Sequence, residues 1–132
     1  AVGAEKAYQQ VFLHTDRLVN RAHAAIQLGM LHDHAQDHAR ALRFYRWVVA
    51  SGLVARREDF GFVLYNIAVQ HLSLGNLEAA ATLLADIRQS RPTLWVQVRN
   101  WLRDSPELLG QLKTHATSRA LFEADEPRYF AA

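Results

Sequence analysis

Apolar residues recur along nearly the whole chain at the three- and four-residue spacing of helices that bury one face. No segment shows the strict alternation of apolar and polar residues that is typical of a half-buried strand. Proline is confined to Pro92, Pro106 and Pro127, so the chain before residue 92 has no proline to break a helix. The pattern predicts an all-α chain of about seven helices, near residues 4–13, 16–34, 37–50, 57–74, 77–90, 94–103 and 106–120.

Residues at several predicted helix ends suit their positions. Asp16 and Asp37 can accept hydrogen bonds from the free amides of the turns that they open. Ser105 precedes a proline, which needs no partner for an amide at the first helical position. Gly52 and Gly75 follow long periodic segments, where a left-handed glycine ends a helix at little cost. Short turns between long helices predict an antiparallel array.

Two segments of the chain share one arrangement of residues. Each has a small residue in a first helix, Gly29 or Ala68, and an alanine in a second helix, Ala41 or Ala80. Such residues let two helices approach closely, and we expect both alanines to be buried where the helices of a pair cross. The matching motifs are Ala25-x-x-Leu28-Gly29-x-x-His32 with Ala41 and Tyr45, and Leu64-x-x-Ile67-Ala68-x-x-His71 with Ala80 and Leu84.

This arrangement resembles the tetratricopeptide repeat (TPR). The two alanines are 39 residues apart, against a repeat of about 34 in the family, which indicates a stretched connection over residues 54–59. The resemblance implies antiparallel helix pairs stacked as a short right-handed superhelix within a single domain. The implied parts are a domain over 1–122, repeats near 22–53 and 61–92, an N-terminal half-repeat at 4–13, capping helices over 94–120 and a tail over 123–132.

The resemblance also implies a concave groove lined by the first helix of each pair. Family members that hold a terminal carboxylate use lysine and asparagine where this chain has Ile26 and Met30, so that clamp is missing. A mostly apolar groove with one flexible methionine suits an amphipathic helix or an extended apolar segment. The alternative is that helix 4–13 or a neighbouring subunit, as in a homodimer, already fills it. The groove positions are His23, Ile26, Met30, Asp33, His34, Phe62, Tyr65, Val69 and Leu72.

Composition excludes several function classes. The chain of 132 residues has no cysteine, which excludes disulfides, thiolate zinc sites and cysteine nucleophiles. Fifteen basic and thirteen acidic residues give a net charge of +2, too little to indicate nucleic-acid binding without a local patch. No apolar run approaches the roughly 18 residues of a membrane span, and no signal-peptide pattern opens the chain. We therefore expect a soluble cytoplasmic domain that binds neither nucleic acid nor membrane.

A histidine-rich stretch over residues 32–38 is the part of the sequence that most suggests a metal site. His34 and His38 are four residues apart, as zinc ligands on one helix would be. The repeat alignment, however, places a turn between them, and His32 occupies a position where the family has a packing aromatic. We favour packing over metal binding. Because no nucleophile, phosphate-loop or dinucleotide motif is present, we expect no enzyme activity, cofactor or metal.

The residues therefore favour a non-catalytic protein–protein interaction module, such as a scaffold, a chaperone or a regulatory subunit. The alternative is a helical accessory domain excised from a larger regulatory protein or enzyme. Arg40, Arg43 and Arg46 recur at three-residue intervals and form a second candidate surface, for an acidic partner or a phosphate. For these arginines a solvated outer helix face is the favoured interpretation.

Overall fold

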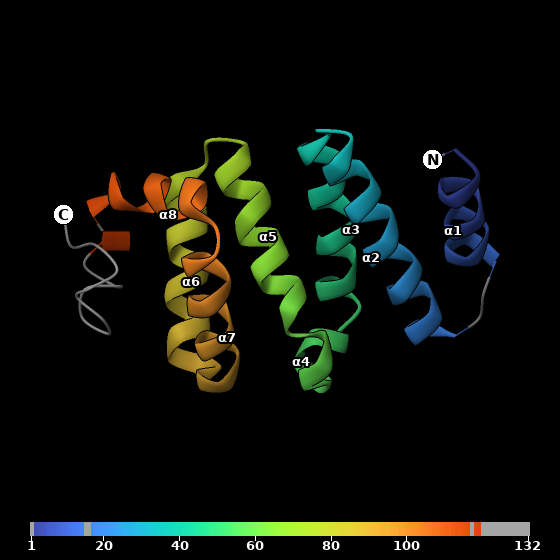
Figure 1. The fold of residues 1–132 in the computed structure, drawn as a ribbon. Coiled ribbons are helices and arrows are strands. Elements are labelled where there is room, and N and C mark those ends of the chain that lie inside the picture. The colour runs from blue at the N-terminus through green and yellow to red at the C-terminus, as the bar shows by residue number, and fades with distance from the viewer. Residues whose placement is uncertain (1, 15–16, 117, 120–132) are drawn as a thin grey trace. The chain divides into compact units, whose positions relative to one another are not determined.

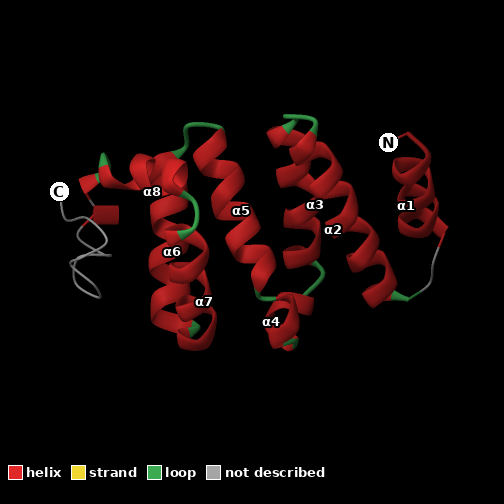
Figure 2. Cartoon of the chain, viewed as in Figure 1, coloured by secondary structure: helices red, strands yellow, loops and turns green. Residues whose placement is uncertain are grey.

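The computed structural model describes residues 2–14, 17–116, 118 and 119. Its regular elements are helical, and no strand occurs among these residues (Figure 2). The prediction of an all-α chain is confirmed. Contacts divide the chain into two units, residues 1–70 and 71–132, and each is described by itself. Asp16 and the predicted tail over 123–132 lie outside the described residues.

The helices fall close to their predicted positions (Figure 1). The described residues form eight α-helices where the sequence predicts about seven, because the stretched connection contains one short helix of its own. The elements are α1 (Val2–His14), α2 (Leu18–His34), α3 (His38–Ala50), α4 (Leu53–Arg56), the 3₁₀ turn η1 (Glu58–Phe60), α5 (Phe62–Ser73), α6 (Leu77–Ser90), α7 (Pro92–Arg103) and α8 (Pro106–Lys113).

In unit 1, α2 and α3 form a tightly packed helical hairpin. A Cβ atom added to Gly29 would lie 2.6, 2.8 and 3.0 Å from three adjacent ring atoms of Tyr45. The three similar distances place Gly29 over the face of the ring. Tyr45 is only 2% exposed and Ala41, one turn earlier on α3, is fully buried. The absence of a side chain at Gly29 therefore allows the two helices to approach this closely.

The turn of this hairpin recurs 39 residues later, between α5 and α6. Gln36 and Gly75 adopt the left-handed conformation, with φ of 63° and 79°. Glycine takes this conformation without steric cost, whereas glutamine does so only rarely. In both turns the next amide donates to a carbonyl five residues earlier, the hydrogen bond of a Schellman motif. These bonds join Asp37 N to His32 O and Asn76 N to His71 O, both at 2.8 Å.

Burial follows the same 39-residue register. The small residues at the predicted crossing points, Ala41 and Ala80, are both 0% exposed, so their predicted burial is confirmed. The aligned positions around them are buried in both segments as well. The aligned pairs are Leu28 and Ile67, Gly29 and Ala68, His32 and His71, Tyr45 and Leu84, and Val48 and Ile87. The two segments thus share a turn geometry and a burial pattern at a spacing of 39 residues.

The predicted start of the fourth helix at residue 57 is wrong. Gly52 ends α3 with a φ of 86°, as expected, and the chain then forms α4 and η1 before α5 begins at Phe62. Phe60 is 1% exposed, and its ring lies 5.3 Å from that of His23 and 5.2 Å from the guanidinium of Arg57. Burial of Phe60 thus holds η1 against α2, so the helix cannot start earlier.

Helix α1 packs on the α2–α3 hairpin through an aromatic cluster. The ring of Phe12 meets those of Phe44 and Trp47 edge to face, with centroids 5.9 and 4.9 Å apart. Arg21 donates a 3.0 Å hydrogen bond from Nε to the carbonyl of Phe12, and its guanidinium lies 5.0 Å from the Trp47 ring. These contacts hold the end of α1 through both packing and cation–π attraction.

In unit 2, α7 and α8 differ in detail from the predicted helices. Helix α7 starts at Pro92 rather than residue 94, and α8 ends at Lys113 rather than near residue 120. The cap at Asp37 is confirmed, because its Oδ1 accepts from the amide of Arg40 at 3.2 Å. Ser105 precedes α8 as expected but makes no capping hydrogen bond with its side chain.

We expect Gly29→Ala to lower the free energy of unfolding by about 1–3 kcal/mol, the usual cost of overpacking a filled core. This cost exceeds the roughly 0.5–1 kcal/mol that alanine gains over glycine inside a helix. Urea denaturation measures both effects. Gly110→Ala is the matched control, because Gly110 lies in α8 with nothing within 4 Å of an added Cβ. That variant should be slightly more stable than the parent.

The second aligned segment of the sequence suggests a rescue, since Ala68 and Leu84 align with Gly29 and Tyr45. In a Tyr45→Leu background, Gly29→Ala should therefore cost clearly less than it does alone. Equal costs in the two backgrounds would show that the ring of Tyr45 does not limit the approach of α2 and α3.

Candidate protein-binding surfaces

The predicted groove residues of α2 differ in their exposure. Met30 is 42% exposed, and His23 and His34 are exposed as well. Ile26 is only 4% exposed, because it lies one turn from both Ala22 and Gly29 on the buried face of the helix. The expectation that Ile26 lines a surface is therefore wrong in this structure.

The predicted groove residues of α5 show the same division. Phe62, Tyr65 and Val69 are half-buried and share one face at three- and four-residue spacing. Leu72 is 2% exposed, since it follows the buried Ala68 by one helical turn. Leu72 offers no surface to a partner either. The side chains that remain accessible in unit 1 are those of His23, Met30, His34, Phe62, Tyr65 and Val69.

The polar end of the predicted groove is part of a side-chain network. His38 Nδ1 lies 2.8 Å from Oε1 of Gln70 and 3.2 Å from Oδ1 of Asp33, and its Nε2 lies 3.2 Å from Oε1 of Gln36. Gln70 is 1% exposed, so His38 supplies a polar partner inside the core of unit 1. Burial, with a smaller contribution from the Asp33 charge, raises the pKa of Tyr45, which keeps this phenol protonated. Through its contact with His38, Asp33 already has a partner within the chain.

The histidines of this stretch do not form the helical pair that a zinc site needs. Helix α2 ends at His34 and α3 begins at His38, so the turn separates them. No cluster of three or more histidine, cysteine or carboxylate side chains suited to a metal occurs among the described residues. His32 is 8% exposed, and its ring stacks on Phe44 with centroids 5.5 Å apart and an interplanar angle of 3°. His32 therefore packs as a flat core side chain.

The second candidate surface is exposed. Arg40, Arg43 and Arg46 all lie on the solvent side of α3. Arg40 Nε is 3.8 Å from a carboxylate oxygen of Asp37, and no ion pair of the other two is found among the described residues. The arrangement fits a solvated helix face.

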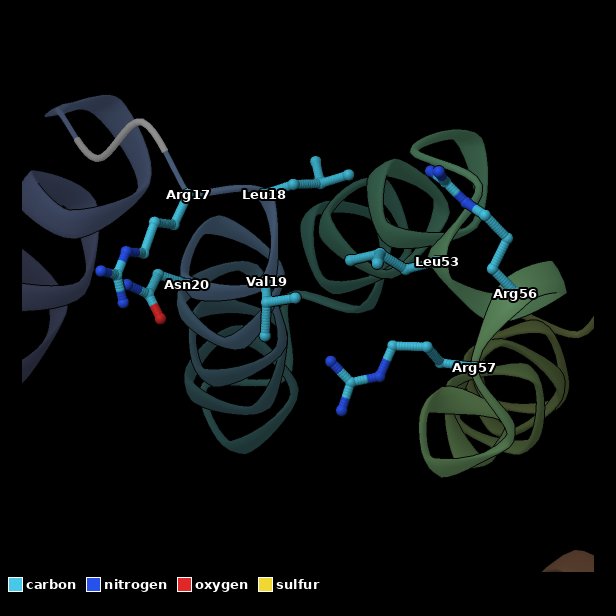
Figure 3. A pocket seen from close by; sticks show the side chains of 7 residues that line it. All are labelled: Arg17, Leu18, Val19, Asn20, Leu53, Arg56 and Arg57. Carbon is cyan, nitrogen blue, oxygen red and sulfur yellow. The ribbon is translucent and has the colours of Figure 1, made fainter.

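Sequence reasoning missed a hollow of about 620 Å³ in unit 1, between the start of α2 and α4 (Figure 3). Its apolar lining comes from Leu18, Val19 and Leu53. Periodicity within a helix cannot pair residues this far apart in the chain, although adjacent arginines in the stretched connection were a signal. Its polar lining residues are Arg17, Asn20, Arg56 and Arg57.

Unit 2 has a hollow of its own along α6, of about 740 Å³. Carboxylates of Glu78 and Asp86 flank the apolar side chains of Ala79 and Leu83 there. Glu78 Oε2 lies 2.9 Å from His115 Nε2, so one of these carboxylates already has a partner within the unit.

Comparison with protein-family models, with curated proteins and with solved structures finds no match to this sequence. The similarity to tetratricopeptide repeats therefore rests on the residues and on the 39-residue register alone. In the part of the chain that the structure describes, no helix is long and apolar enough to span a bilayer.

We expect His38→Ala to lower the free energy of unfolding by about 1–3 kcal/mol, because the buried amide of Gln70 then loses its partner. His34→Ala is the control, since this exposed side chain should matter by less than about 0.5 kcal/mol. Urea denaturation measures both variants. Equal losses would contradict the role of the His38–Gln70 hydrogen bond, and a rise in melting temperature on adding zinc that both variants abolish would instead indicate a metal site.

Proposed function

We propose that the chain is a non-catalytic protein–protein interaction module, built from TPR-like helix pairs, that binds a segment of a partner protein. The observation that carries this proposal is the 39-residue register shared by two helix–turn–helix segments. Repeated helix pairs present extended surfaces, and proteins built from them commonly use such surfaces for binding. A scaffold, a chaperone and a regulatory subunit are the roles that this architecture suits.

The accessible residues of α2 and α5 in unit 1 form the proposed binding surface. Met30 is its adaptable element, because an unbranched thioether can repack against different partners. Phe62, Tyr65 and Val69 supply half-buried apolar area, which a partner can cover without displacing the core. The surface fits an apolar segment, such as one face of an amphipathic helix.

Cytoplasmic location is part of the proposal and is supported by composition. The chain contains no cysteine, and nothing in it depends on an oxidising compartment. The balanced charge of +2 supports a protein partner rather than a nucleic acid.

We expect Tyr65→Ala to weaken binding of the partner by about thirtyfold, or roughly 2 kcal/mol, because binding energy concentrates in a few aromatic side chains. The partner is captured from native lysate, purified and titrated by calorimetry. Met30→Glu is a second variant: its exposed side chain should leave the melting temperature unchanged, while the new charge would have to lose its water in the complex.

Arg43→Ala is the matched control and should bind like the parent. If Met30→Glu and Tyr65→Ala bind with unchanged affinity while Arg43→Ala binds weakly, the α2–α5 surface is wrong and the arginines of α3 carry the binding. In that case binding would also fade as the salt concentration rises, whereas apolar contact is insensitive to salt.

A further inference from the structure

The hollow between α2 and α4 combines an apolar floor with arginine side chains, and this combination has no role in the fold described above. Leu53 is 5% exposed and forms its deepest part, whereas Leu18, at 36% exposed, stands at its rim. Figure 3 shows Leu53 between Val19 on one side and Arg56 and Arg57 on the other. An aliphatic side chain from another molecule would find apolar contacts here.

Arg56 provides a positive charge at the edge of this hollow. Its Nε donates to the carbonyl of Gly52 at 3.3 Å, and one terminal nitrogen donates to the carbonyl of Ser51 at 3.1 Å. Both acceptors are neutral groups at the end of α3, so they orient the guanidinium without neutralising it. No ion pair of Arg56 is found among the described residues. Its remaining N–H groups can therefore donate to a further acceptor.

The next residue, Arg57, already binds a carboxylate of this chain at the edge of the hollow. Its Nε and one terminal nitrogen lie 3.1 and 2.7 Å from the two carboxylate oxygens of Asp59. The hydrogen bonds from Arg57 lower the pKa of Asp59, so this carboxylate stays charged. The charge of Arg57 is thus offset within the chain, and the inference rests on Arg56.

We propose that this hollow is a second docking site, which binds an acidic segment of a partner protein. An aliphatic side chain of the segment packs on Leu18, Val19 and Leu53, and a neighbouring carboxylate pairs with Arg56. Charge complementarity selects this occupant, because the acceptors that orient Arg56 are neutral and the lining includes no carboxylate. The apolar floor favours a peptide over a nucleic acid, whose backbone would bring charge but no aliphatic group. None of the accessible residues of α2 and α5 named above lines this hollow, so separate variants can test the two sites.

The test uses a fluorescein-labelled peptide of three Glu-Asp-Leu repeats and a matched peptide of three Gln-Asn-Leu repeats. Fluorescence anisotropy at low salt should show binding of the acidic peptide and much weaker binding of the neutral one. Amide NMR shifts should change around Leu18–Asn20 and Leu53–Arg57. Arg56→Gln should weaken binding roughly tenfold, as expected for truncating one partner of an interfacial charge pair. Arg43→Gln removes the same charge from α3 and should change little.

Further variants separate the possible failures. Leu18→Gln should also weaken binding of the acidic peptide. Because Leu18 lies outside α4, this variant still tests the site if Arg56→Gln disturbs that helix. Met30→Glu should leave the affinity for this peptide unchanged. A failure of the proposed α2–α5 surface can therefore be distinguished from a failure of the site in the hollow. Equal losses with Arg56→Gln and Arg43→Gln would overturn the proposal, because they indicate unspecific charge attraction. An oligothymidylate that binds more tightly than the peptide, and that needs Arg56, would overturn the assignment to a protein partner.

Discussion

The contact between Gly29 and the face of the Tyr45 ring sets how closely α2 and α3 approach. A Cβ at position 29 would come within 2.6 Å of the ring, so the hairpin in this form requires glycine there. The buried face of α2 follows from this contact, because Ala22, Ala25 and His32 lie one or two turns from Gly29 on the same side. The register of the turn then places the buried Ala41 of α3 on the side that faces α2. Helix α1 packs on the outside of the α2–α3 hairpin.

This buried face also determines which parts of α2 remain for binding. Met30 lies near the end of the helix, and Leu18 and Val19 lie at its start, where they line the hollow. Leu18 and Met30 are separated by a single rigid helix, about 18 Å at 1.5 Å per residue. A partner segment long enough to cover both sites could meet an apolar surface at one end and an arginine-edged hollow at the other. The helix thus acts as a fixed spacer between the two proposed sites.

The sequence predicted most of the helices because their apolar faces are periodic and because Gly52 and Gly75 mark helix ends chemically. It did not predict the left-handed Gln36, which no local propensity indicates, although its alignment with Gly75 does. The start of α5 was missed because burial of Phe60 against His23 is a tertiary contact. Ile26 and Leu72 were assigned to a surface because the resemblance to a family shows which positions correspond, but not how each side chain packs in this chain. The hollow was missed for the same reason, since Leu18 and Leu53 come together only through the fold.

Proton NMR of the intact chain tests the central claim, that α2 and α3 pack through Gly29 and Tyr45, most directly. A glycine over the face of an aromatic ring has its α-protons shifted upfield by the ring current. The structure predicts upfield-shifted Gly29 α-protons with nuclear Overhauser cross-peaks to the ring protons of Tyr45. Unshifted Gly29 protons without these cross-peaks, in a chain that is otherwise folded and helical, would contradict the hairpin and the surfaces derived from it.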